Sequence, residues 1–225
     1  MGGFIGVNIK TTSNKILSFI LELAAGLMIS IVCFDLIPEA LELSNIYNVL
    51  VGVIIGVISM IICDNVIKAK FTKTKTSSLL KTGIIVGIGL AIHNFPEGLA
   101  IGSGFEASIK LGYSLAIAIA LHDIPEGISM AVPMKNGGMS KKKALLLTFL
   151  SGITTGIGTL FGGIMGTISV ELIALCLAFS AGAMLYIVSR RINTGIKKDI
   201  SRKVCFFRQY TRVLIRDIVN YNKLV

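Results

Sequence analysis

Six long apolar stretches constrain this chain more than any other feature of its sequence. A bilayer core of about 30 Å is crossed by roughly 20 apolar residues in a helix. The stretches that reach or approach this length are Ile16–Ile37, Val49–Ile67, Gly83–Phe105, Leu111–Met134, Ala144–Ile168 and Leu172–Val188. Because lipid leaves backbone polar groups without partners, we expect an all-α polytopic transmembrane helical bundle of about six spans.

The composition agrees with an integral membrane protein and excludes several other classes. Apolar residues make up 53% of the 225 residues and charged residues only 15%, whereas a soluble domain carries about 25% charged residues. Disordered, collagen-like and disulfide-rich secreted chains are excluded by the same composition. The cysteines are scattered and form no Cys-x-x-Cys pair, so we interpret them as small buried apolar side chains and not as a disulfide or zinc framework. They are Cys33, Cys63, Cys176 and Cys205.

Lysine and arginine alternate along the segments that connect the apolar stretches. Segments 1–15, 68–82, 135–143 and 189–225 contain two, five, four and ten of them, whereas 38–48, 106–110 and 169–171 contain none, one and none. Under the positive-inside rule, this pattern predicts six spans with both termini in the cytoplasm. We therefore expect a multi-pass protein of the cytoplasmic (plasma) membrane.

The basic excess of the chain belongs to its last segment. Residues 189–225 hold ten Lys/Arg and two Asp/Glu, which favours a cytoplasmic tail facing the lipid bilayer and not a nucleic-acid-binding segment. Because the composition changes abruptly at Ser189, one interpretation of the tail is a frameshift product. The alternative is an amphipathic surface helix, with an apolar face made of Phe207, Tyr210, Leu214 and Ile218.

Both histidines of the chain lie inside apolar stretches, in two copies of one phrase. Residues 93–98 read His-Asn-Phe-Pro-Glu-Gly, and residues 122–127 read His-Asp-Ile-Pro-Glu-Gly. In a helix, each copy places its His and its Glu four residues apart on one face. Ionisable side chains at bilayer depth cost about 2.5–3.5 kcal/mol each, so they are usually functional.

The chemistry of the two phrases favours a divalent metal ion. Imidazole and carboxylate ligands suit zinc, iron, manganese and nickel, and Glu97 and Glu126 could bridge two ions. Pro96 and Pro125 each remove a backbone donor, so we expect helix-breaking near the site. The alternative, a structural hydrogen bond, is disfavoured by the repetition of the phrase. The predicted metal ligands are His93, Asn94, Glu97, His122, Asp123 and Glu126.

A partial match to this phrase occurs at the end of the first apolar stretch. Asp35 and Glu39 are four residues apart and lie on either side of a proline. One interpretation is a cation entrance at the extracytoplasmic side. The other is an ordinary interfacial helix end, and the sequence leaves both open.

The doubled phrase resembles the signature of the ZIP (Zrt/Irt-like) divalent metal transporter family. Residues 35–40 (Asp-Leu-Ile-Pro-Glu-Ala) and 181–188 (Ala-Gly-Ala-Met-Leu-Tyr-Ile-Val) also resemble its bacterial GufA/ZupT-like branch. The resemblance covers about residues 1–188, which we treat as a ZIP-like transmembrane domain. It implies a homodimer, an elevator-like movement and a binuclear centre. One ion would bind His93, Glu97, His122 and Glu126, and the other would bind Asn94, Glu97, Asp123 and Glu126.

Three departures separate the chain from this family pattern. The family usually has eight spans, and here the first and last helices are absent. A family Glu in the fifth predicted span is replaced, since residues 150–156 contain no carboxylate. After Val188, the basic tail replaces an acidic phrase and a final apolar helix.

The predicted function is membrane transport of divalent metal cations, Zn²⁺ first among them, into the cytoplasm. The ion is the transported substrate, and we expect no cofactor, no catalytic residue and no enzyme activity. One alternative is a non-transporting metal-binding remnant or regulatory subunit, which the absent helices allow. A second alternative, an intramembrane metallohydrolase, needs a free general base, and the acidic groups of the phrases are already assigned as ligands.

Overall fold

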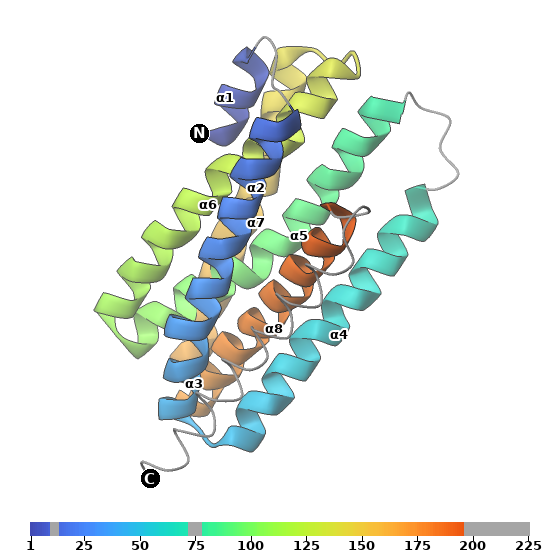
Figure 1. Cartoon of the computed structure of the whole chain (residues 1–225). Helices are drawn as coiled ribbons and strands as arrows, with labels where there is room; N and C mark the ends of the chain where they lie inside the picture. The colour runs from blue at the N-terminus through green and yellow to red at the C-terminus, as the bar shows by residue number, and fades with distance from the viewer. Residues whose placement is uncertain (10–13, 72–77, 196–225) are drawn as a thin grey trace. The chain divides into compact units, whose positions relative to one another are not determined.

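The computed structural model describes residues 1–9, 14–71 and 78–195, which are helical almost throughout (Figure 1). The helices are α1 (Gly2–Asn8), α2 (Asn14–Ser30), the π-helical segment η1 (Ile31–Leu36), α3 (Ile37–Leu43), α4 (Ile46–Phe71), α5 (Ser78–Ala107), α6 (Ile109–Asn136), α7 (Lys141–Gly166) and α8 (Val170–Gly195). No strand occurs in these described parts. The prediction of an all-α polytopic bundle is confirmed.

Six helical segments are long and apolar enough to cross a membrane. They are Glu22–Leu43, Ile46–Ile67, Gly83–Ala107, Ile109–Asn136, Lys141–Gly166 and Val170–Ser189. These match the six predicted spans, with ends that differ by a few residues. The first span differs most, because its helix runs on past Pro38 to Leu43. Pro38 lies in the first turn of α3, directly after the wide turns of η1, where a missing N–H is tolerated.

Contacts divide the chain into two units, residues 1–187 and 188–225. The second unit is described only as far as residue 195, so most of the predicted tail and Cys205 lie outside the described residues. The division into a ZIP-like domain and a basic tail, and the origin of that tail, stay predictions.

Within the first unit, α5 packs closely on both α6 and α7. Glycines permit the contact with α7, because a Cβ at Gly98 or Gly102 would collide with the carbonyl of Thr155 or Thr159. Gly158 and Gly162 on α7 meet α5 carbonyls in the same way. Residue numbers rise together along this interface, so α5 and α7 run parallel. The predicted role of GxxxG spacing in helix packing applies here.

A single residue separates α5 from α6. Ser108 is extended, and its hydroxyl accepts a hydrogen bond from the N–H of Leu111 at 3.2 Å. This N-cap starts α6 at once, so α5 and α6 form a tight helical hairpin. The two copies of the phrase therefore lie side by side on neighbouring helices.

Candidate metal centre

The two phrases stay helical through their prolines. Pro96 lies inside α5, and Pro125 lies inside α6. The expected helix breaks at Pro96 and Pro125 are therefore absent, and each proline removes one backbone donor without ending its helix. In membrane proteins, the loss of one backbone hydrogen bond at a proline is tolerated where neighbouring helices pack against the helix. Each copy keeps its His and Glu on one face, and these two faces meet across the hairpin.

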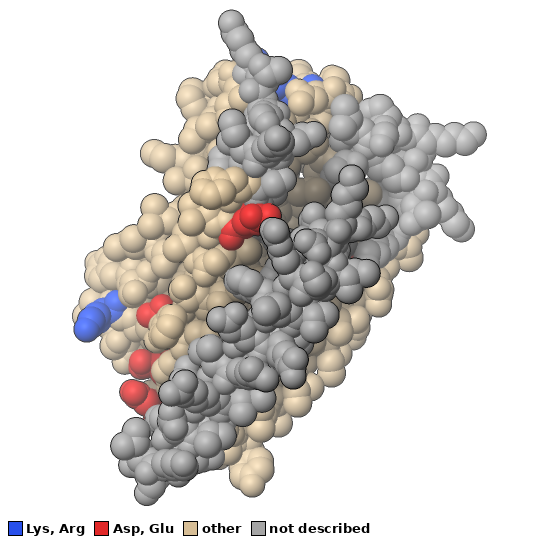
Figure 2. Space-filling model, viewed as in Figure 1, with Lys and Arg blue, Asp and Glu red and all other residues tan. Residues whose placement is uncertain are grey.

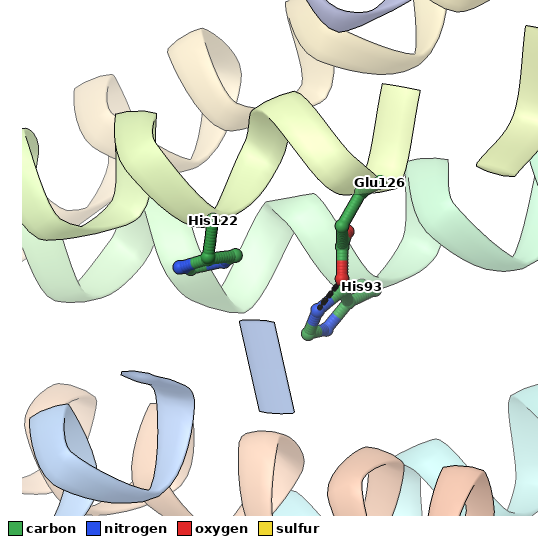
Figure 3. A group of neighbouring side chains, drawn as sticks. All are labelled: His93, His122 and Glu126. Carbon is green, nitrogen blue, oxygen red and sulfur yellow. Dashed lines mark ion pairs between the residues drawn. The ribbon is translucent and has the colours of Figure 1, made fainter. Parts of the chain in front are cut away.

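Four buried side chains form the centre of the cluster. The Nε2 atoms of His93 and His122 each lie 2.8 Å from Oε1 of Glu97. His93 Nε2 is also 3.5 Å from Oε1 of Glu126. The exposed fraction is 2% for His93, 0% for His122 and Glu97, and 3% for Glu126. Figure 3 shows His122 and Glu126 projecting from α6 toward the space that also holds His93 of α5.

Ligand atoms of this cluster fall into two overlapping groups. In each group, the atoms lie within 4.8 Å of one another. The first group is His93, His122 and Glu126, and the second is Glu97, His122 and Asp123. The geometry thus overlaps the two ligand sets that the resemblance implies without reproducing them, because His122 belongs to both groups. Asp123 is the most exposed member, with 33% of its side chain accessible.

Asn94 of α5 is held by a hydrogen bond to α7. Its Nδ2 donates a hydrogen bond to the carbonyl of Ser151 on α7 at 3.1 Å. Its Oδ1 is buried, and no residue of the described parts of the chain gives it a hydrogen bond. The amide is therefore fixed by α7 with its oxygen still available as a ligand.

Several buried polar atoms of the cluster have no hydrogen-bond partner among residues 1–9, 14–71 and 78–195. They include Nδ1 of His93, Nδ1 of His122, Oε2 of Glu97 and Oδ1 of Asn94. A buried polar atom without a partner is rare and calls for an explanation. All four are electron-pair donors in the right protonation state, so the donor set fits a cation.

The structure places Asp35 and Glu39 outside both ligand groups. Asp35 lies in η1 and Glu39 in α3, and both are half-buried. On the face drawn in Figure 2, acidic atoms gather toward the lower end, where Figure 1 shows α3. Glu42 and Glu106 are exposed and lie in the last turns of α3 and α5, at this lysine-poor end. The cation entrance stays a prediction.

Sequence reasoning missed a buried carboxylate outside the cluster. Asp64 of α4 is 5% exposed and accepts a hydrogen bond from the hydroxyl of Tyr186 on α8 at 3.1 Å. An aspartate inside an apolar stretch is a signal in itself, but its partner on α8 is more than a hundred residues away. This pair joins α4 to α8 and contributes no atom to the ligand groups.

Comparisons with known proteins show the family of the chain. The family model described as ZIP zinc transporter matches residues 68–202, which include both phrases and more than half of the chain. The chain belongs to the ZIP zinc transporter family. The zinc transporter ZupT of Corynebacterium glutamicum is 31% identical over 220 residues, which cover 87% of this chain and 84% of the relative. ZupT of Escherichia coli O127:H6 is 33% identical over 197 residues, with 82% and 77% covered.

Membership of the ZIP family confirms the resemblance found in the sequence, including its ZupT-like branch. The names of the family and its relatives describe transporters and not enzymes. The departure in α7 is also visible in the structure. There, Asn94 of the cluster is bonded to the carbonyl of Ser151, and residues 150–156 contain no carboxylate.

Proposed function

We propose that the chain carries Zn²⁺ or a related divalent cation across the plasma membrane into the cytoplasm, through the cluster between α5 and α6. The observation that carries the proposal is the burial of two imidazoles beside Glu97 and Glu126 within apolar helices. With Asp123, the cluster holds three carboxylates. Charges at this depth are costly unless they are compensated, and one or two divalent ions compensate them.

The residues of the cluster have separable roles in this proposal. Asp123 is the most accessible ligand, so it receives the ion as water is removed. Glu97 lies against both imidazoles, so it holds the ion at the centre and neutralises its charge. Asn94 offers a neutral oxygen from the α7 side. Since protonated His and Glu do not ligate metals, acid weakens binding.

The lysine-rich connections are proposed to face the cytoplasm. Figure 1 places the C-terminal end of α4, the N-terminal end of α5 and the connection between α6 and α7 toward the same end. A cavity of about 190 Å³ lies between α5, α6 and α7 on this side of His93, with Gly87, Ala91, Met130 and Ser151 in its wall. Its lining is mostly apolar, so it offers few ligands that would hold an ion leaving the cluster. Asp35 and Glu39 would gather cations at the opposite end.

A homodimer and a rigid shift of the helices complete the proposal. Both are implied by membership of the family and would let the ion leave without opening the whole bundle. A non-transporting metal-binding remnant or regulatory subunit differs from this proposal in one measurable respect: it binds metal and moves none.

The test is uptake of ⁶⁵Zn²⁺ into proteoliposomes that hold the purified full chain. We expect saturable uptake that the double variant Glu97→Ala/Glu126→Ala abolishes. A matched control is Glu42→Ala/Glu106→Ala, which removes two exposed carboxylates and leaves the cluster intact. Zn²⁺ binding without uptake by the unmodified chain would support the non-transporting alternative. Equal uptake by the unmodified chain and the Glu97/Glu126 variant would remove the cluster from the pathway.

A further inference from the structure

A second group of metal-ligating atoms lies between α7 and α8. The thiol of Cys176 points at the thioether of Met165, with 3.8 Å between Sγ and Sδ. Cys176 is 4% exposed, and its thiol also meets the Ser103 hydroxyl of α5. Ser103 is six residues beyond Glu97, or about 9 Å along the helix axis. This sulfur pair, Cys176 and Met165, shares no residue with the His/Glu cluster.

The spacing of the two sulfur atoms suits a single bound ion. A metal–sulfur bond is about 2.3 Å long, so one ion reaches two sulfur atoms as far apart as about 4.6 Å. The pair at 3.8 Å falls within this reach. Thiolate and thioether together are soft ligands, and they select Cu(I) over hard cations.

Charge narrows the choice of ion further. When Cys176 binds a metal, its thiol proton leaves to water and the thiolate carries one negative charge. Met165 and Ser103 are neutral, so a monovalent cation gives a complex with no net charge. A divalent cation would leave an uncompensated positive charge among apolar helices, which is unfavourable. The sulfur pair therefore differs in ligand charge from the carboxylate-rich centre.

The pair lies close to the lysine-poor end of the spans. Met165 is the last residue but one of α7. Glu106, which is exposed at the end of α5, lies against the neighbouring Gly166. Ser180 lies one turn beyond Cys176 on the same face of α8 and is 0% exposed. Its Oγ has no hydrogen-bond partner in the described parts of the chain. The carboxylate of Glu106 thus lies on the side of the sulfur pair that is nearer the end of the spans. The hydroxyl of Ser180 lies on the opposite side, nearer the middle of α8.

We propose that Cys176 and Met165 form a site for a thiophilic monovalent cation, Cu⁺, separate from the His/Glu centre. An ion bound by both residues ties α7 to α8. The site stands on the sulfur contact and the charge balance, so it does not depend on transport of Zn²⁺.

The experiment measures Cu⁺ binding to the purified full chain without oxygen, in competition with a coloured Cu⁺ chelator. We expect one tight site whose affinity falls at least about tenfold in Cys176→Ser and also in Met165→Leu. The second change conserves side-chain volume, so the helices should pack as before. X-ray absorption of the bound copper should show sulfur neighbours, and their number should drop in Met165→Leu.

Two control variants separate this site from other sources of Cu⁺ binding. Cys63→Ser removes a half-buried thiol from α4 and should leave the affinity unchanged. His93→Gln/His122→Gln disables the His/Glu centre and should leave the sulfur signal intact. Loss of Cu⁺ in the histidine variant, or nitrogen neighbours alone in the absorption spectrum, would overturn the proposal. So would Cu⁺ binding that Cys176→Ser lowers and Met165→Leu leaves unchanged, because that result describes a single thiol.

Discussion

The two copies of the His-x-x-Pro-Glu-Gly phrase fold alike but meet different surroundings. In α5, Asn94 is buried and bonded to α7, and Gly98 lies against the carbonyl of Thr155. In α6, the equivalent Asp123 is one-third exposed, and Gly127 lies against the short helix α1. The phrase sets which face carries His and Glu, whereas the third helix that each copy meets sets its access to water. The α5 copy thus forms the inner wall of the centre, and the α6 copy its accessible side.

The largest difference between the copies should appear at their glutamates. Glu97 Oε1 is 2.8 Å from both imidazoles, whereas Glu126 Oε1 is 3.5 Å from His93. We expect Glu97→Gln to weaken Zn²⁺ binding about 100-fold or more, which is about 2.8 kcal/mol, and Glu126→Gln about tenfold. Isothermal titration calorimetry in detergent measures both. Equal losses would show that the two copies contribute equally to the centre.

The glycines that follow the glutamates should differ in their effect on stability. A methyl at Gly98 collides with the backbone of α7, so Gly98→Ala should lower the free energy of unfolding by about 3 kcal/mol. Gly127→Ala meets the N–H of Gly3, but α1 has only seven residues and can shift, so we expect about 1 kcal/mol. SDS-induced unfolding measures both losses.

A control for these glycine changes lies on α7. Apart from its own stretch of helix, no atom of the described residues lies within 4 Å of a Cβ at Gly156, so Gly156→Ala should cost nothing. A larger loss for Gly127→Ala than for Gly98→Ala would reverse the assignment of the inner wall.

Changes at the second residue of each copy, Asn94 and Asp123, should differ in their effect on stability while both lower the affinity for Zn²⁺. Asn94→Ala removes the hydrogen bond to Ser151 and should cost about 1–2 kcal/mol of unfolding free energy. Asp123→Ala removes a partly exposed side chain and should change stability by less than about 0.5 kcal/mol. Both changes should weaken Zn²⁺ binding. If Asp123→Ala destabilises the fold as much as Asn94→Ala, the contrast between inner and accessible copies is wrong.

A change remote from both copies should have the smallest effect on Zn²⁺ affinity and set its baseline. Tyr186→Phe removes the hydroxyl that donates to Asp64 across α4 and α8. We expect a loss of about 1 kcal/mol in unfolding free energy and no change in Zn²⁺ affinity. A fall in affinity would mean that this pair is coupled to the centre. Asp64→Asn serves as the matching change on the other helix.

Much of the fold could be predicted because its signals are local. Six apolar stretches define six spans, and the spacing of His93 and Glu97 along one helix fixes their common face. The repetition of the phrase on the next span then predicts that the two faces meet. Each of these inferences needs only the period of a helix and the thickness of a bilayer.

The contacts between helices that the sequence did not predict depend on which face each helix presents to its neighbours. Nothing near Asn94 in the sequence indicates that its amide binds Ser151 of α7. The contact between Cys176 and Met165 likewise depends on which faces of α7 and α8 meet. The cysteines were interpreted as buried, yet Cys33 and Cys63 are only partly buried. In lipid, an apolar side chain gains little from facing inward, so the sequence does not decide between the two directions.

The single-residue link at Ser108 has a consequence for how the protein is made. Every residue of the two ligand groups lies between His93 and Glu126, in one helical hairpin with its turn at Ser108. Closing such a short loop costs little chain entropy, and contacts that are close in sequence form early. The ligands can therefore assemble as soon as α6 has been synthesised and inserted, before α7 and α8 exist. The later helices then bury a hairpin that has already formed.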